Sequence, residues 1–161
     1  MTASPSMTTR PATRLLMTLM LALGLSGGIA ATSAPPAEAV VSAATATSAL
    51  SQAVSKRGSP YQYGAMGPYR FDCSGLTKWS YARARKYLPR TAAQQYNATQ
   101  PISPASRRPG DLVFFISGGT VGHVGIYAGA NKMWHSPRTG SYVKLSTIWA
   151  SFPAVRYGRV R

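Results

Sequence analysis

Apolar residues in the middle of the chain recur three or four positions apart, the spacing that places side chains on one face of an α-helix. Leu76, Trp79 and Ala82 show this spacing, and basic residues occupy several positions between and after them. Gly58 and Pro89 each follow such a segment and are residues at which helices end. The pattern predicts helices over residues 48–57, 76–87 and 91–99.

From residue 111 onward, the apolar residues instead form short runs separated by turns. The run 111–116 (DLVFFI) follows a Pro-Gly turn, and the run 121–127 (VGHVGIY) follows a Gly-Gly turn. Short apolar runs bounded by turns are typical of buried strands. The pattern predicts strands over residues 111–116, 121–127, 132–135, 141–145 and 154–160. Because the predicted helices precede the predicted strands along the chain, the sequence predicts an α+β domain with an antiparallel sheet.

The first 39 residues have the order of a secretory signal peptide. Arg10 and Arg14 precede an apolar run at 15–25 (LLMTLMLALGL), and 37–39 (AEA) offers a cleavage site before Val40. We therefore expect a secreted protein, extracellular or associated with the cell wall, with no stable membrane insertion after cleavage. The apolar run is short for a membrane span, and an uncleaved anchor is the alternative.

The residues after the predicted cleavage site divide into two parts. Residues 40–47 are rich in Ala, Ser and Thr and are expected to form a flexible lead-in. Residues 48–161 contain all the predicted helices and strands. They are therefore expected to form one folded domain.

The chain is strongly basic, with 18 lysines and arginines against 3 acidic residues and a formal charge of +15. Such a surface favours polyanionic surroundings such as nucleic acid, an anionic membrane or an acidic cell wall. The basic residues are mostly scattered, and the sequence has neither zinc-finger spacing nor an aromatic ribonucleoprotein motif. A nucleic-acid partner is therefore not expected.

The scarcity of acidic residues narrows the chemistry. Apart from Glu38, which precedes the predicted cleavage site, the acidic residues are Asp72 and Asp111. Asp111 follows a Pro-Gly turn and is expected to accept backbone N–H groups of that turn. This leaves little for glycosidase chemistry, which needs a pair of carboxylates. The close ligand spacings of zinc motifs are also missing, so we expect neither a metal site nor a cofactor.

The only cysteine, Cys73, lies just before a predicted helix, and the only histidines are His123 and His135. The positive end of a helix lowers the pKa of a cysteine and favours the reactive thiolate. One cysteine and two histidines can supply a nucleophile, a base and a residue that orients the base. The alternative is a buried, inert thiol. In an exported protein, a single cysteine favours the reactive role or intermolecular pairing.

Five segments together resemble the NlpC/P60 cell-wall peptidases, which are papain-like cysteine peptidases. They occur in the order and at the usual spacing of that family and are 60–64 (PYQYG), 72–76 (DCSGL), 108–115 (RPGDLVFF), 122–127 (GHVGIY) and 134–136 (WHS). Ala65 is one departure, since a second glycine is common there. The resemblance implies a papain-like catalytic domain at 48–161, with N-terminal helices packed on a five- to six-stranded antiparallel sheet.

The resemblance also implies roles for single residues. Cys73 matches the nucleophile, His123 the general base, and His135 the polar residue that orients the base. Tyr61 matches a tyrosine whose hydroxyl helps to hold the oxyanion. If the two histidines lie on neighbouring antiparallel strands, both side chains can point to the same face of the sheet.

The substrate follows from the same resemblance. Asp72 and Ser74 match residues that line a subsite for a free α-amino group. The family implies hydrolysis of peptidoglycan stem peptides, most often between D-γ-glutamyl and a diamino acid such as diaminopimelate. Two alternatives remain open: an acyltransferase or amidase that uses the same thiol, and a non-catalytic protein that binds the anionic cell wall.

Overall fold

The computed structural model describes residues 39–161, so the predicted signal peptide, except for Ala39, lies outside the described residues. No helix within this range is long and apolar enough to cross a membrane. The elements in chain order are α1 (Ala43–Val54), α2 (Cys73–Arg83), α3 (Ala92–Asn97), β1 (Thr99–Ile102), the 3₁₀ helix η1 (Pro104–Ser106), β2 (Leu112–Ser117), β3 (Thr120–Gly129), β4 (Lys132–His135), β5 (Lys144–Thr147) and β6 (Ala154–Val160).

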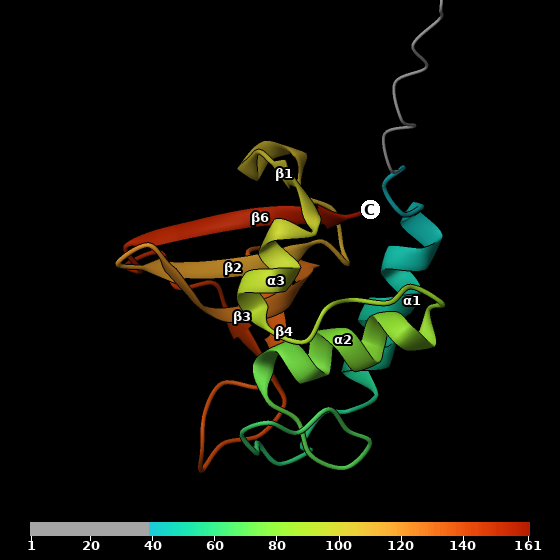
Figure 1. Cartoon of the computed structure of the whole chain (residues 1–161), viewed down its shortest axis with the longest axis vertical. Helices are drawn as coiled ribbons and strands as arrows, with labels where there is room; N and C mark the ends of the chain where they lie inside the picture. The colour runs from blue at the N-terminus through green and yellow to red at the C-terminus, as the bar shows by residue number, and fades with distance from the viewer. Residues whose placement is uncertain (1–38) are drawn as a thin grey trace, which may run out of the picture. The chain divides into compact units, whose positions relative to one another are not determined.

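The six strands form one sheet in the order β1-β6-β2-β3-β4-β5, and every neighbouring pair is antiparallel. In the view of Figure 1, α3 lies in front of this sheet, α2 lies below it, and α1 packs against α2. The α+β class, with helices packed on an antiparallel sheet of six strands, is thereby confirmed.

Strand β2 builds a core on both faces of the sheet because successive side chains point to opposite sides. Leu112 and Phe114 join the larger core beneath the helices. Val113 and Phe115 join a smaller core on the other face, which also includes Ile148 from the β5–β6 connection. The side chains of these four β2 residues are fully buried, as the continuous apolar run predicted.

The first helix begins at Ala43, so the prediction of a flexible lead-in is wrong for residues 43–47. Its buried residues are alanines, which give no strong apolar pattern but let the helix approach its neighbours closely. Ser42 caps the helix by accepting the backbone N–H of Thr45 at 3.1 Å. Just before it, the Val41 N–H donates to the carbonyl of Val160 in β6 at 2.9 Å. This segment is therefore tied to the sheet.

Other elements also differ from the prediction. Helix α2 starts at Cys73 and ends at Arg83, and Arg85, with φ of 61°, lies in the left-handed region beyond it. Strand β1 was missed because Pro101 lies within it. Proline is tolerated there because β1 is an edge strand that pairs only with β6. Strand β5 begins at Lys144 rather than at residue 141.

Candidate active site

Cys73 is the first residue of α2, and the chain fixes it there from both sides. Phe71 before it and Leu76 after it are fully buried in the core beneath the helices. Asp72 caps the helix by accepting the backbone N–H of Gly75 at 2.7 Å. The cysteine is half-buried and lines a cavity of about 390 Å³. Its backbone is therefore anchored, while its side chain borders a space that can hold a ligand.

Asp72 is more than a helix cap, because Arg90 forms an ion pair with it. Arg90 Nη2 pairs with Asp72 Oδ2, and Nη1 donates to Asp72 Oδ1 at 3.2 Å and to Ser74 Oγ at 2.9 Å. Asp72 Oδ2 also accepts the backbone N–H of Gly64 at 2.9 Å. Both carboxylate oxygens are thus engaged, and a substrate ammonium would have to share Asp72 with Arg90.

The pKa of the Cys73 thiol is raised above its ordinary value, although the position at a helix start predicted the opposite. Burial is the main cause, and the negative charge of Asp72 adds to it. Backbone N–H groups of Val124, Ser74 and Cys73 itself lower the pKa, but not by enough to compensate. The prediction of a lowered thiol pKa is therefore wrong. Desolvation outweighs the helix start, and the resting thiol is protonated at neutral pH.

The structure brings His123 and His135 together from the neighbouring strands β3 and β4. Nε2 of His123 lies 2.8 Å from Nδ1 of His135, so both rings occupy the same face of the sheet, as expected for neighbouring antiparallel strands. Nε2 of His135 in turn lies 3.0 Å from Oγ of Ser146 in β5. This chain of contacts uses Nε2 of His123 and leaves its Nδ1 for another partner.

Aromatic rings pack around the histidine pair. Trp149, in the β5–β6 connection, stacks on His123 with ring centroids 5.6 Å apart and meets His135 edge-on at 5.5 Å. Phe115 packs against both Trp149 and His123.

Burial lowers the pKa of His123 to about 4. It also lowers the pKa of His135 to about 3, and the positive charges of His123 and Lys144 add to this second shift. Both imidazoles are therefore neutral at neutral pH.

Tyr61 lies in the loop that precedes α2 and lines the same cavity as Cys73. Its backbone N–H donates to the carbonyl of Ser141 at 2.9 Å, and a bridge joins it to Phe71. Burial raises the pKa of the Tyr61 phenol, and the charges of Cys73 and Asp72 raise it further. The hydroxyl therefore keeps its proton at neutral pH and can donate a hydrogen bond.

Four of the six predicted site residues line this one cavity: Tyr61, Asp72, Cys73 and Ser74. Residues 121–122 of β3, immediately before His123, form part of its wall. Among the hydrogen bonds of the described residues, none joins the Cys73 thiol to His123 directly. Catalytic hydrogen bonds are often long in free enzymes and shorten when substrate binds.

Three residues of the site were not predicted from the sequence: Arg90, Ser146 and Trp149. Arg90 is one of many arginines, and Ser146 is one of many serines, so neither type carries a signal in this chain. Trp149 does carry one, because it is a large aromatic residue outside the predicted strands.

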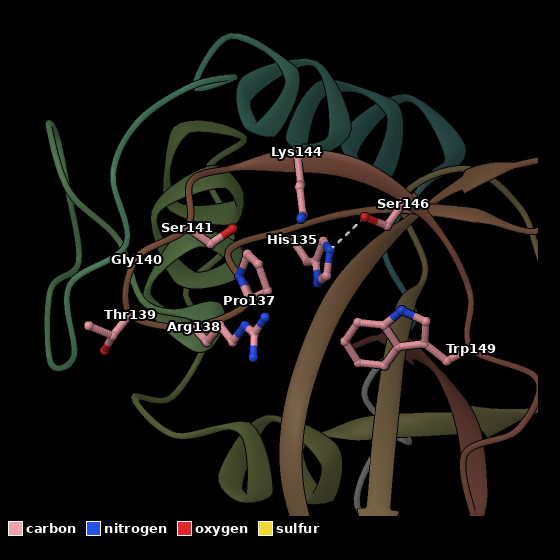
Figure 2. Close-up of a pocket in the computed structure, with 9 residues that line it drawn as sticks. All are labelled: His135, Pro137, Arg138, Thr139, Gly140, Ser141, Lys144, Ser146 and Trp149. Atoms are coloured by element: carbon pink, nitrogen blue, oxygen red, sulfur yellow. Dashed lines mark hydrogen bonds between the residues drawn. The ribbon is translucent and has the colours of Figure 1, made fainter.

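A second cavity, of about 500 Å³, lies beside His135 (Figure 2). We call it the cationic cavity, because Arg138 and Lys144 are among its lining residues and none of those residues is acidic. Its wall also includes Ser146, the hydrogen-bond partner of His135, and Trp149. The histidine pair therefore lies next to a second space in addition to the one that Cys73 lines.

Comparison with known proteins agrees with this geometry. The family model described as "NlpC/P60 family" matches residues 58–161. A probable endopeptidase from Corynebacterium glutamicum is 44% identical over 103 residues, which cover 64% of this chain and 48% of that protein. This chain thus spans about half the length of that relative.

Two solved structures show the range of related proteins. The peptidoglycan hydrolase RipB from Mycobacterium tuberculosis superposes with a TM-score of 0.65 at 27% identity, covering 73% of this chain and 65% of RipB. RipD from the same organism superposes with a TM-score of 0.63 at 28% identity, covering 73% of this chain and 98% of RipD. RipD is described as a non-catalytic domain protein adapted to peptidoglycan binding.

Proposed function

Because the chain belongs to the NlpC/P60 family, we propose that it is a cysteine peptidase that hydrolyses peptidoglycan stem peptides. The observation that carries this proposal is the hydrogen bond between His123 and His135, next to the cavity that Cys73 lines. The pair supplies an oriented neutral imidazole, which is the form that can accept a proton. The similarity to RipB, a peptidoglycan hydrolase, supports the substrate class.

The proposed reaction begins with a neutral thiol and a neutral imidazole. Nδ1 of His123 accepts the Cys73 proton while the sulfur attacks the carbonyl carbon of the scissile amide. The imidazolium then gives this proton to the leaving amine, the C–N bond breaks, and a thioester remains. Water attacks the thioester carbon while His123 accepts its proton; the C–S bond breaks, and the proton returns to the sulfur.

His135 and Tyr61 assist without forming bonds to the substrate. The Nδ1 of His135 accepts Nε2–H of His123, which holds that ring in the tautomer with Nδ1 unprotonated. The Tyr61 hydroxyl and a backbone N–H at the start of α2 stabilise the oxyanion. Each such donor is typically worth about 3 kcal/mol of transition-state stabilisation.

The bond we propose is the one between D-γ-glutamyl and a diamino acid. Asp72 and Ser74 line the cavity of Cys73, and their polar atoms can receive the free α-amino group of an N-terminal L-Ala. Arg90 already donates hydrogen bonds to both Asp72 and Ser74, so it limits how this amino group can approach them. The preference for a free amino group is therefore a property of Asp72, Ser74 and Arg90 together.

The test compares the unaltered protein with Cys73→Ala on L-Ala-γ-D-Glu-diaminopimelate and on whole peptidoglycan, with products identified by mass spectrometry. We expect the unaltered protein to release L-Ala-D-Glu and Cys73→Ala to release none. Ser51→Ala, at an exposed position of α1, is the matched control and should retain activity. Equal release by Cys73→Ala would rule out the thiol as nucleophile.

Two observations favour a second candidate, a non-catalytic wall-binding protein. The pKa of the thiol is raised, and RipD shows that a related domain binds peptidoglycan without catalysis. The presence of Cys73, His123 and His135 in this chain argues against that function. Slow alkylation of Cys73 together with retention on peptidoglycan and no product would favour it. An acyl-enzyme that transfers to an added amine rather than to water would instead reveal an acyltransferase.

The proposed site of action is outside the cell, at the wall. Residues 1–39 have the order of a signal peptide, and residues 40–161 carry 16 basic and 2 acidic side chains. Sequencing the N-terminus of the protein recovered from culture medium or from the wall fraction tests this. A mature N-terminus at Val40 is expected, whereas a full-length protein in the membrane fraction would contradict the proposal.

A further inference from the structure

The cationic cavity has the composition of a binding site for a carboxylate. Figure 2 shows the Lys144 ammonium and the Arg138 guanidinium directed toward the space beside His135. The hydroxyl groups of Thr139 and Ser141 are also part of the wall and can donate further hydrogen bonds. Hydrogen bonds from charged donors to a carboxylate are about twice as strong as neutral ones.

No carboxylate side chain in residues 39–161 is free to neutralise these two cations. Asp72 is paired with Arg90, and Asp111 is paired with Arg159. Lys144 is half-buried, and its charge is one cause of the lowered pKa of His135. The cavity therefore holds positive charge that no acidic side chain of the described residues balances.

The position of this cavity relative to the thiol suggests which part of a substrate it receives. The cavity of Cys73 and the cationic cavity are neighbours, because Tyr61 lines the first, Ser141 lines the second, and the two are joined by a backbone hydrogen bond of 2.9 Å. His135 lines the cationic cavity and contacts His123, the proposed proton donor to the leaving amine. The leaving amine takes its proton from Nδ1 of His123, whereas Nε2 faces His135, so only the distal part of the leaving group can reach past His135 into the cationic cavity.

We propose that the cationic cavity binds a carboxylate of the leaving diamino acid and that Lys144 and Arg138 determine this specificity. The inference rests on the proposed function, in which the leaving amine belongs to a diamino acid such as diaminopimelate. The acyl part of the substrate occupies the cavity of Cys73, and the distal carboxylate of the leaving part enters the cationic cavity. A diamino acid without that carboxylate leaves the two cations unpaired.

The test uses two tripeptides, L-Ala-γ-D-Glu-diaminopimelate and the same peptide with a carboxamide in place of the distal carboxylate. We expect the kcat/KM of the unaltered protein to be at least about tenfold higher for the carboxylate peptide than for the carboxamide peptide. Lys144→Gln and Arg138→Gln should each lower kcat/KM for this peptide by about tenfold, mainly through KM. In both variants the ratio of kcat/KM for the two peptides should fall toward one, because the carboxylate no longer gains from the missing cation.

Lys132→Gln is the matched control, because Lys132 is an exposed lysine on the neighbouring strand β4 and its loss changes the net charge equally. Lys132→Gln should leave kcat/KM for both peptides unchanged. If the unaltered protein cleaves the two peptides equally well, or if Lys144→Gln slows both equally, the carboxylate assignment is overturned while the proposed function stands.

If neither peptide is cleaved, the proposed function fails, and calorimetric titration with free diaminopimelate then decides the inference. Binding that Lys144→Gln weakens by about tenfold and Lys132→Gln does not would support the carboxylate site. Absence of binding to the unaltered protein would overturn it.

Discussion

The two hydrogen bonds of His135 couple the proton on His123 to the hydroxyl of Ser146. When His123 donates from Nε2 to Nδ1 of His135, the neutral His135 ring carries its proton on Nε2 and donates it to Ser146 Oγ. When Ser146 donates instead, the direction of both bonds reverses, and Nδ1 of His123 is protonated. Only the first arrangement leaves His123 with an unprotonated Nδ1, so Ser146 as acceptor favours the tautomer that the proposed reaction requires.

We therefore predict that Ser146→Ala lowers kcat by about tenfold with little change in KM, because the His135 proton loses its acceptor. Ser146→Thr, which retains the hydroxyl, should restore most of the activity. Thr147→Ala, at the next and exposed position of β5, is the control. A Ser146→Ala protein with unchanged kcat would show that the serine does not position the base.

The lowered pKa of His123 predicts activity at acidic pH. Because His123 becomes protonated only near pH 4, it remains a base well below the pH at which an ordinary histidine, with a pKa of about 6.5, is protonated. We expect the acidic limb of the pH dependence of kcat/KM to have its midpoint near pH 4 to 5. A midpoint at or above pH 6.5 would contradict this explanation.

The same histidines predict how stability depends on pH. Between about pH 6.5 and 4, the unfolded chain binds protons at both histidines, whereas the folded protein does not. The free energy of unfolding should therefore decrease as the pH falls through this window, by up to about 1.4 kcal/mol per pH unit for each histidine. Urea unfolding at several pH values measures the slope, and His135→Gln should reduce it.

At the scale of elements, Asp111 connects the start of β2 to β6. It accepts the backbone N–H of Arg108 at 2.8 Å, which confirms the predicted role in the Pro-Gly turn. It also accepts two hydrogen bonds from Arg159 of β6, at 3.0 and 2.9 Å. Asp111 is almost fully buried, so Arg159 replaces the water that would otherwise bind its carboxylate.

We predict that Asp111→Asn destabilises the protein by about 3 kcal/mol, because the amide cannot balance the charge of Arg159. The urea midpoint should fall without a change in the slope of the transition. Arg156→Gln, an exposed arginine of β6, should change stability by less than about 0.5 kcal/mol. If Asp111→Asn lowers the free energy of unfolding no more than the control does, the ion pair between Asp111 and Arg159 does not contribute to stability.

The elements show what the sequence could and could not predict. The buried strands β2, β3 and β6 were found because continuous or alternating apolar residues mark them directly. The start of α1 was missed because its buried residues are alanines, whose small side chains give no periodic signal, and β1 was missed because Pro101 suggested a connector. Local patterns therefore predicted strands well and close helix packing poorly.

For the candidate site as well, the sequence indicated residues with a local signal and missed those defined by distant contacts. Cys73 and the two histidines were singled out from the sequence because they are the only residues of their types and because the segments that contain them resemble a known family. Arg90 and Ser146 could not be predicted, since their roles come from contacts across 16 to 18 residues with Ser74 and Asp72, and across 11 residues with His135. The pKa of Cys73 was predicted in the wrong direction because its burial depends on the whole fold.

At the scale of the whole molecule, positive charge greatly exceeds negative charge. Residues 40–161 carry 16 lysines and arginines and 2 aspartates, and both aspartates are in ion pairs. We predict that adsorption to purified anionic walls falls by about tenfold or more between 0.05 and 1 M NaCl, because salt screens exposed charges. Cleavage of a soluble tripeptide should depend less on salt. Adsorption that salt does not change would show that contacts other than charge hold the protein on the wall.

The two buried histidines also influence how the net charge of the described residues responds to acidity. Histidine and cysteine have the ordinary side-chain pKa values closest to neutral pH, and in this fold the pKa values of His123 and His135 lie at about 4 and 3. Burial moves the pKa of the single thiol upward. None of these three groups therefore changes its charge appreciably between about pH 5 and 8. If the wall retains the domain differently at different pH within this range, we expect the ionisation of the wall to be the main cause.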